Sequence, residues 1–252
     1  MNLVLLFPED LVAPDRARLA GRRLAHVREV HRAAVGDDLA VGLLGGKMGR
    51  GRVRRLDGEA LELDLALDQD PPPKLPLTLV IAVPRPKVLN RVVAASASLG
   101  VARIVLVNAW KVEKAYWSSP RMAPENLRQQ LLLGLEQAKD TVLPELRLAR
   151  LFRPFVEDAL PVLLQGGTGL LAHPGAEQGP PRGLAAPLTL AIGPEGGWIE
   201  AERASLQGAG MHPVGLGPRI LRTETSLAAL VGQLALPFQV PCTTPPPLEG
   251  RS

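Results

Sequence analysis

The stretch Thr189–Leu230, TLAIGPEGGWIEAERASLQGAGMHPVGLGPRILRTETSLAAL, decides the fold of this chain. The apolar run Leu188–Ile192 leads directly into a glycine-rich turn, and a second short apolar run ends in another, Gly215–Arg219. In an open α/β sheet, loops at the carboxyl ends of strands are where small ligands bind, and glycine lets the backbone approach a ligand closely. The stretch therefore predicts two strand–turn–helix units with a candidate ligand site at their turns. The spacing alone favours plain turns over a ligand site.

The literal strings are more informative than the spacing. IGPEGGW at Ile192–Trp198, followed by LGPRILRTETS at Leu216–Ser226, resembles the RsmE family of small-subunit ribosomal RNA methyltransferases, which methylate a uridine at N3. That family belongs to the SPOUT superfamily, whose members bind S-adenosylmethionine (AdoMet) in a knotted part of the chain. The resemblance implies an α/β SPOUT domain with a parallel sheet and a trefoil knot, in which Gly215–Thr225 would pass through an earlier loop. Residue patterns alone do not predict a knot.

Composition and linker signals divide the chain. Its 252 residues are 46% hydrophobic and 21% charged, enough for one large or two modest globular domains. Residues 68–76 mark a boundary, because three consecutive prolines fit neither a helix nor a central strand. We predict a small β-barrel over residues 1–70, an α/β domain over 71–240 and a Pro-rich, disordered tail over 241–252. The resemblance implies that the α/β domain is the methyltransferase domain. The resemblance implies that the barrel is PUA-like and helps to bind RNA.

Hydrophobic periodicity predicts the elements of both parts. Before the boundary the pattern predicts strands at 2–7, 38–44, 51–56 and 60–67. After it, strands are predicted at 77–83, 102–108, 146–151, 169–173 and 188–192, and helices at 87–99, 124–139, 156–164, 199–209 and 223–236. This alternation predicts a mainly parallel sheet covered on both faces. The apolar stripe of the last helix fits either the core or a contact between subunits, and the resemblance implies a homodimer.

Basic residues are unevenly distributed. Residues 16–55 hold eleven Lys or Arg against three acids, and the whole chain has a net charge of +4. Such a block suits a polyanion such as ribosomal RNA, although a solvated surface is an equal alternative. Aromatic residues are only 3% of the chain, so we expect phosphate contacts and shape recognition more than base stacking. The candidate RNA contacts are Arg22, Arg23, Arg28 and Arg32, with Lys87 at a position where the family has a lysine.

Several classes of site and location are excluded. A single cysteine, Cys242, rules out an intrachain disulfide framework and a Cys-rich zinc site, and the four histidines do not form a ligand cluster, so we expect no metal. Residues 1–7 are too short for a secretory signal, and no apolar run is as long as a membrane span. We expect a cytoplasmic protein without a membrane partner.

The resemblance places cofactor contacts in three loops. They are His173, Pro174, Ile192, Gly193, Glu195, Gly196, Gly197, Leu216, Gly217, Ile220, Leu221, Thr223 and Thr225. Glycine-rich backbone could contact adenine and ribose, and Ile220 and Leu221 could supply an apolar wall. Thr223 and Thr225 could instead cap the following helix, the preferred role for Thr223. His173 is expected to pack the loop rather than to act as a base.

Methyl transfer to uridine N3 requires the base to lose a proton, and a nearby cation would favour the developing anion. This makes Arg222, and secondarily Arg219, the catalytic candidates. The alternative is that one of these arginines pairs with Glu195 or Glu224 and only holds the loop.

Two positions depart from the family pattern. Ser98 stands where the family has a glutamate before Leu-Gly, and Asp140 where it has the arginine of Glu-Gln-Ser-x-Arg. We hypothesise that these two family side chains pair, so that losing both is milder than losing one. The departures leave open a paralogue that acts on another RNA, or a catalytically silent AdoMet-binding ribosome-assembly protein. A nucleotide-dependent α/β enzyme is disfavoured, because no GxGxxG or GxxxxGK[ST] string follows a strand.

Overall fold

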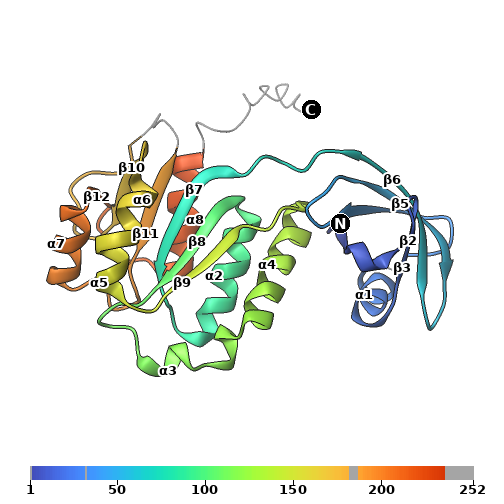
Figure 1. The fold of residues 1–252 in the computed structure, drawn as a ribbon, viewed down its shortest axis with the longest axis horizontal. Helices are drawn as coiled ribbons and strands as arrows, with labels where there is room; N and C mark the ends of the chain where they lie inside the picture. The colour runs from blue at the N-terminus through green and yellow to red at the C-terminus, as the bar shows by residue number, and fades with distance from the viewer. Residues whose placement is uncertain (1, 32, 182–186, 236–252) are drawn as a thin grey trace, which may run out of the picture.

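The computed structural model describes residues 2–31, 33–181 and 187–235, so the predicted tail at 241–252 lies outside the described residues. Two six-stranded sheets lie at opposite ends of the molecule, and the extended β6–β7 segment runs between them (Figure 1). The last strand of the first sheet ends at Gln69, and the first strand of the second begins at Leu75. The change of sheet therefore falls at the proline run.

The first sheet has the order β1-β4-β5-β6-β3-β2, with β1 parallel to β4 and every other pair antiparallel. Its strands are β1 (Val4–Leu6), β2 (Leu11–Ala13), β3 (Arg16–Leu19), β4 (Asp38–Leu43), β5 (Met48–Leu56) and β6 (Leu61–Gln69). Its helical segments are η1 (Pro8–Asp10), α1 (Gly21–His26) and η2 (Val27–His31). All four predicted strands are confirmed. Strands β2 and β3 were missed, because they are short and β3 buries only two residues, Ala17 and Leu19.

The second sheet is entirely parallel, with the order β12-β10-β11-β7-β8-β9. Its strands are β7 (Leu75–Ala82), β8 (Val101–Val107), β9 (Glu145–Ala149), β10 (Thr168–Ala172), β11 (Leu188–Ile192) and β12 (Met211–Val214). The helical segments are α2 (Pro86–Ser98), α3 (Lys114–Trp117), η3 (Pro120–Met122), α4 (Pro124–Ala138), α5 (Phe152–Pro154), η4 (Phe155–Ala159), α6 (Leu160–Leu164), α7 (Glu200–Gly208) and α8 (Thr223–Ala235). In Figure 1, α5 and α6 lie in front of the sheet and α8 behind it. The predicted α/β fold with a parallel sheet is confirmed.

Burial explains this arrangement. Strands β7, β8 and β11 are apolar along almost their whole length, as expected of strands covered on both faces. The predicted stripe of α8 is buried in the core of this sheet. Its members are Leu227, Leu230, Val231 and Leu234.

Helices α2 and α4 approach each other at Gly134. A Cβ at this position would overlap the carbonyl oxygen of Ala94 and lie 2.7 Å from the Cβ of Ala97. In an open helix, Gly→Ala stabilises by about 1 kcal/mol. Here the added methyl must separate two packed helices, so we expect Gly134→Ala to lower the free energy of unfolding by about 1–3 kcal/mol in urea titrations. Gly232→Ala on α8, which meets open space, is the matched control and should stabilise. Equal stabilisation by both substitutions would contradict the close packing.

The two sheets are joined through the end of α4. Leu3, which directly precedes β1, donates its N–H to the carbonyl of Glu136 at 2.9 Å. The N–H of Gly45 donates to the carbonyl of Thr141 at 2.8 Å, and the Thr141 hydroxyl donates to the carbonyl of Gly46 at 2.6 Å. Leu3 and Leu5 also pack on Leu132 of α4. The first sheet therefore has a fixed attachment to the second.

Asp140, one of the two departures from the family pattern, lies at this junction. Its carboxylate is 3% exposed, pairs with the Lys74 ammonium at 2.7 Å and accepts the N–H of Val142 at 2.9 Å. The Ser98 hydroxyl instead donates to the carbonyl of Ala95 at 2.9 Å. The buried acid at position 140 thus has a base from the linker as its partner, and Ser98 needs none.

Candidate cofactor-binding and active site

A cavity of about 650 Å³ opens at the carboxyl ends of four adjacent strands, β12, β10, β11 and β7. The loops after β10, β11 and β12 line it together with the start of α2 and the start of α8. Glycine-rich loops from distant parts of the sequence therefore meet at one edge of the parallel sheet. This is the place where open α/β sheets bind ligands.

Most sequence-predicted residues lie in the lining of this cavity. Those present are His173, Pro174, Ile192, Gly193, Glu195, Gly196, Gly197, Leu216, Arg219, Ile220, Leu221, Arg222 and Thr223. Gly217 and Thr225 are not among the lining residues. Gly217 has a φ of +90°, so the turn itself needs glycine there. Ile220 is 85% exposed, so the predicted apolar wall is open to solvent on one side.

The floor of the cavity is closely packed. A Cβ on Gly215 would lie 3.0 Å from the carbonyl oxygen of Ala176, so a larger residue would push two cavity loops apart. Trp198 is buried, and its indole N–H has no acceptor within the described residues. A buried donor without a partner is unfavourable, so a ligand acceptor that reached it would be favoured.

The acidic side chains of the lining have their own partners. Glu195 accepts the backbone N–H of Arg85 at 2.9 Å, and Glu224 pairs with Arg91 at 3.1 Å. The alternative in which one of these glutamates holds Arg219 or Arg222 is not seen among the described residues. Both arginines are exposed, and neither forms an ion pair within the described part of the chain. Their guanidinium groups are free to meet an anion.

Thr223 is the first residue of α8 and is buried. Among the residues that the structure describes, its hydroxyl makes no hydrogen bond to the helix backbone, so the preferred capping role is not seen. Thr225 lies exposed on the first turn of the same helix.

His173 packs within its loop. Its Nδ1 lies 3.1 Å from the N–H of Gly175, and its Nε2 lies 3.1 Å from Nη1 of Arg203. Both neighbours are donors, so a protonated ring would oppose both. Burial, followed by the charge of Arg203, lowers the pKa of His173 below its ordinary value of 6.5. A neutral ring that accepts from its own loop agrees with a packing role.

An NMR titration should report this lowered pKa of His173. Because the folded protein binds this proton more weakly than the unfolded chain, the contribution of His173 to stability is present above the unfolded pKa and is lost as pH falls through the folded one. Arg203→Gln should raise the pKa by removing the second cause. A His173 pKa at or above 6.5 in the wild-type protein would contradict the assignment.

Sequence reasoning missed other residues at this site besides Trp198. Two of them line the cavity: Arg85, the residue before α2, and Arg91 on α2 itself. The buried carboxylate of Glu202 accepts the N–H groups of Trp110 at 2.7 Å and Ile199 at 3.0 Å. Lys111 donates from Nζ to the carbonyl of Gly196 at 2.6 Å. Among these residues, Arg85 carries a sequence signal, because it lies in the short loop at the carboxyl end of the predicted first strand of the α/β part.

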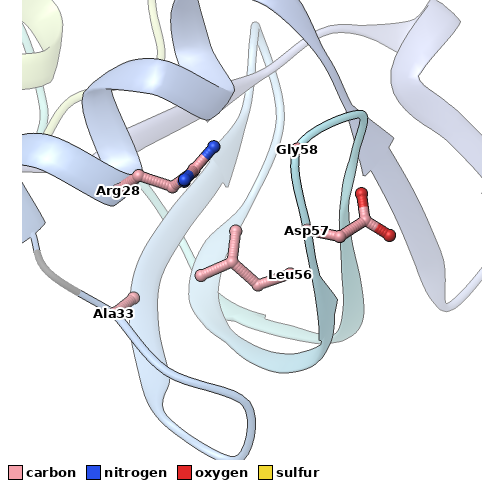
Figure 2. A pocket seen from close by; sticks show the side chains of 5 residues that line it. All are labelled: Arg28, Ala33, Leu56, Asp57 and Gly58. Carbon is pink, nitrogen blue, oxygen red and sulfur yellow. The ribbon is translucent and has the colours of Figure 1, made fainter.

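The predicted RNA contacts of the first sheet are in different situations. Arg28 is exposed and lines an open cavity of about 410 Å³ between η2 and the β5–β6 turn. Figure 2 shows it reaching toward this turn, whereas the Asp57 carboxylate points away. Arg23 is only 22% exposed, pairs bidentately with Asp10 and lies over the Phe7 ring. Its charge is therefore already used inside the protein.

The remaining RNA candidates are less informative. Arg22 lies in α1, and its side chain is outside what the structure describes, as is the whole of Arg32. Lys87 is exposed on α2 but does not line the large cavity. Acidic strand β6 neighbours basic strand β5, where Arg54 lies 3.6 Å from Asp64. Neighbouring acids therefore neutralise part of the positive charge of residues 16–55.

Two classes of site are not seen in residues 2–31, 33–181 and 187–235. No group of three or more His, Cys, Asp or Glu side chains there could hold a metal ion. No helix in these ranges is both long and apolar enough to cross a membrane.

The family model for the RNA methyltransferase domain matches residues 71–235, which include the large cavity and the whole second sheet. A relative from Treponema pallidum, named ribosomal RNA small subunit methyltransferase E, is 32% identical over 236 residues, covering 91% of this chain and 88% of the relative. The chain belongs to this methyltransferase family. A second member, from Synechocystis, is 26% identical over 92% of this chain and 76% of its own length.

Solved structures of the family share the fold. A methyltransferase E from Neisseria gonorrhoeae, bound to S-adenosyl methionine, has a TM-score of 0.74 at 23% identity and covers 92% of this chain and 95% of its own. A methyltransferase from Legionella pneumophila, also with the cofactor, has a TM-score of 0.67 at 24% identity, over 92% and 96% of the two chains. At identities of 23% and 24%, this likeness shows a shared fold.

Proposed function

We propose that this chain is an AdoMet-dependent RNA methyltransferase that methylates N3 of a uridine in small-subunit (16S) ribosomal RNA. The observation that carries the proposal is the meeting of the GPEGGW loop, the LGPRILRTET loop and the loop after β10 around one cavity. The curated relatives of the family carry the name of this activity.

The residues of the cavity fit AdoMet. Its volume of about 650 Å³ lies in the range of small-ligand sites. The glycine-rich backbone can approach a nucleoside closely. The buried indole N–H of Trp198 has no acceptor among the described residues and could donate to the ligand. We assign cofactor contacts to the lining residues of the three loops, and Gly217 and Thr225 to the support of the turn and helix. When bound, AdoMet supplies an activated methyl group, and no metal is required.

The protein then has to position the uridine and stabilise its charge. N3 of the base must lose a proton, and the free guanidinium of Arg222 stabilises the resulting anion from the cavity wall. Arg219, on the same loop, gives weaker support from the rim. Orienting the base in line with the methyl group supplies much of the remaining acceleration.

We assign RNA binding to residues 1–70 as a PUA-like barrel, with Arg28 as its best-placed cation, and catalysis to residues 71–240 as a SPOUT domain. We also propose the trefoil knot that the SPOUT resemblance implies. The loops after β10 and β12 are in contact, because the Gly215 N–H donates to the Gln178 carbonyl at 2.8 Å. A homodimer acting on small ribosomal subunits in the cytoplasm completes the proposal.

The test is transfer of labelled methyl from AdoMet to unmodified small subunits, with free ribosomal RNA and tRNA in parallel and the modified base identified by mass. We expect N3-methyluridine in small-subunit RNA. Label in another RNA would keep the chemistry and change the substrate. No label, with AdoMet still bound, would favour the silent binding protein.

A further inference from the structure

Trp110, in the loop after β8, is 79% exposed. The other two tryptophans serve the fold. The indole N–H of Trp117 donates to Asn108 at 2.9 Å and its ring lies 5.1 Å from the guanidinium carbon of Arg150, and Trp198 is buried in the core. Among the described residues, no aromatic ring or cation contacts the Trp110 ring. An indole in water contributes little to folding, so the Trp110 ring is available to a binding partner.

The backbone that presents Trp110 is tightly held. The Trp110 N–H donates to the buried carboxylate of Glu202 at 2.7 Å, and the other oxygen of this carboxylate accepts from Ile199 at 3.0 Å. The next residue, Lys111, donates from Nζ to the carbonyl of Gly196 at 2.6 Å. Gly196 lines the large cavity. The Trp110 loop is therefore fastened to α7 through Glu202 and to the cavity loop through Gly196.

The charges around this ring favour a polyanion. The segment 109–121 carries Lys111, Lys114 and Arg121 against a single acid, Glu113. The nearby cavity adds the guanidinium groups of Arg85, Arg219 and Arg222. An exposed aromatic ring in a basic stretch of chain is the kind of platform on which proteins stack bases of single-stranded nucleic acids.

We propose that Trp110 is a stacking platform for a nucleobase of the substrate RNA, adjacent to the uridine that enters the cavity. The inference rests on the proposed function and adds a base contact that a chain with so few aromatics did not lead us to expect. A second copy of this chain is the less favoured occupant. A twofold interface centred on this loop would bring its Lys111, Lys114 and Arg121 close to their own copies.

The experiment measures binding and methylation of small-subunit RNA by Trp110→Ala and Trp110→Phe. Loss of one stacked base predicts about a tenfold rise in Kd and KM for RNA with Trp110→Ala, whereas Trp110→Phe keeps most of the affinity. The kcat at saturating RNA and the Kd for AdoMet should stay within about twofold. Leu151→Ala, which removes another exposed apolar side chain (67% exposed), should change none of these values.

Tryptophan emission separates this inference from the proposed function. RNA should quench the wild-type emission, and the quenched component should be absent in Trp110→Phe. If the wild type transfers no methyl to any RNA, the proposed function fails. The difference in quenching between the wild type and Trp110→Phe still shows whether Trp110 stacks on RNA. An RNA Kd within twofold of wild type for Trp110→Ala would overturn the inference. The inference would also be overturned if Trp110→Ala lost self-association in sedimentation and that loss accounted for the whole rise in the RNA Kd.

Discussion

Arg222→Ala lowers kcat for methyl transfer by about 100- to 1,000-fold, the usual loss when one preorganised donor to a developing anion is removed. The reason lies in the cavity. Glu224 is held by Arg91 and Glu195 by the backbone of Arg85, so no carboxylate neutralises the Arg222 guanidinium in the described residues. Its charge is available for the uridine anion, which exists only after N3 loses its proton.

The measurement is single-turnover methylation of small-subunit RNA at saturating AdoMet. Arg222→Lys should recover part of the rate by restoring the charge, and Arg219→Ala should lose less than Arg222→Ala. The Kd of AdoMet should change little in all three variants. A kcat within threefold of wild type for Arg222→Ala would exclude it as the stabilising cation.

Asp140→Ala lowers the free energy of unfolding by about 3–5 kcal/mol, the usual effect of removing one partner of a buried ion pair. The Asp140 carboxylate is 3% exposed and the Lys74 ammonium 14%, so water cannot replace the lost partner well. The N–H of Val142 also loses its acceptor. Because this junction fastens the first sheet to α4, we expect the two sheets to lose their fixed attachment at the same time.

Urea unfolding followed by circular dichroism measures this loss. The double variant Lys74→Met/Asp140→Leu leaves no unpaired charge and should recover most of the stability. Arg153→Ala, which breaks an exposed pair with Glu157, should cost less than about 0.5 kcal/mol. A loss below 1 kcal/mol for Asp140→Ala would show that the pair is not effectively buried.

The sequence predicts the α/β part well because its strands are apolar runs bounded by turn residues. The run at 188–192 is β11, and the turns after it and after Val214 meet at the cavity. Strand β3 has no such run, since Arg16 and Arg18 alternate with only two apolar residues. Its position is set by pairing with β6, far away in sequence.

Contacts between distant residues account for the parts of the site that could not be predicted. Charge alone made Arg23 a candidate for RNA, whereas its partner Asp10 is thirteen residues away. Lys74 and Asp140 are 66 residues apart, and Trp110 and Glu202 are 92 apart. No local pattern relates such pairs. The literal strings supplied the cavity residues, and only the fold shows which arginines are free.

A crystal structure of the protein grown with AdoMet tests the central claim most directly. The account predicts the cofactor in the large cavity, held by the loops that follow β10, β11 and β12, with Arg222 on the side from which a uridine would enter. A cofactor bound elsewhere, or none at millimolar AdoMet, would contradict it.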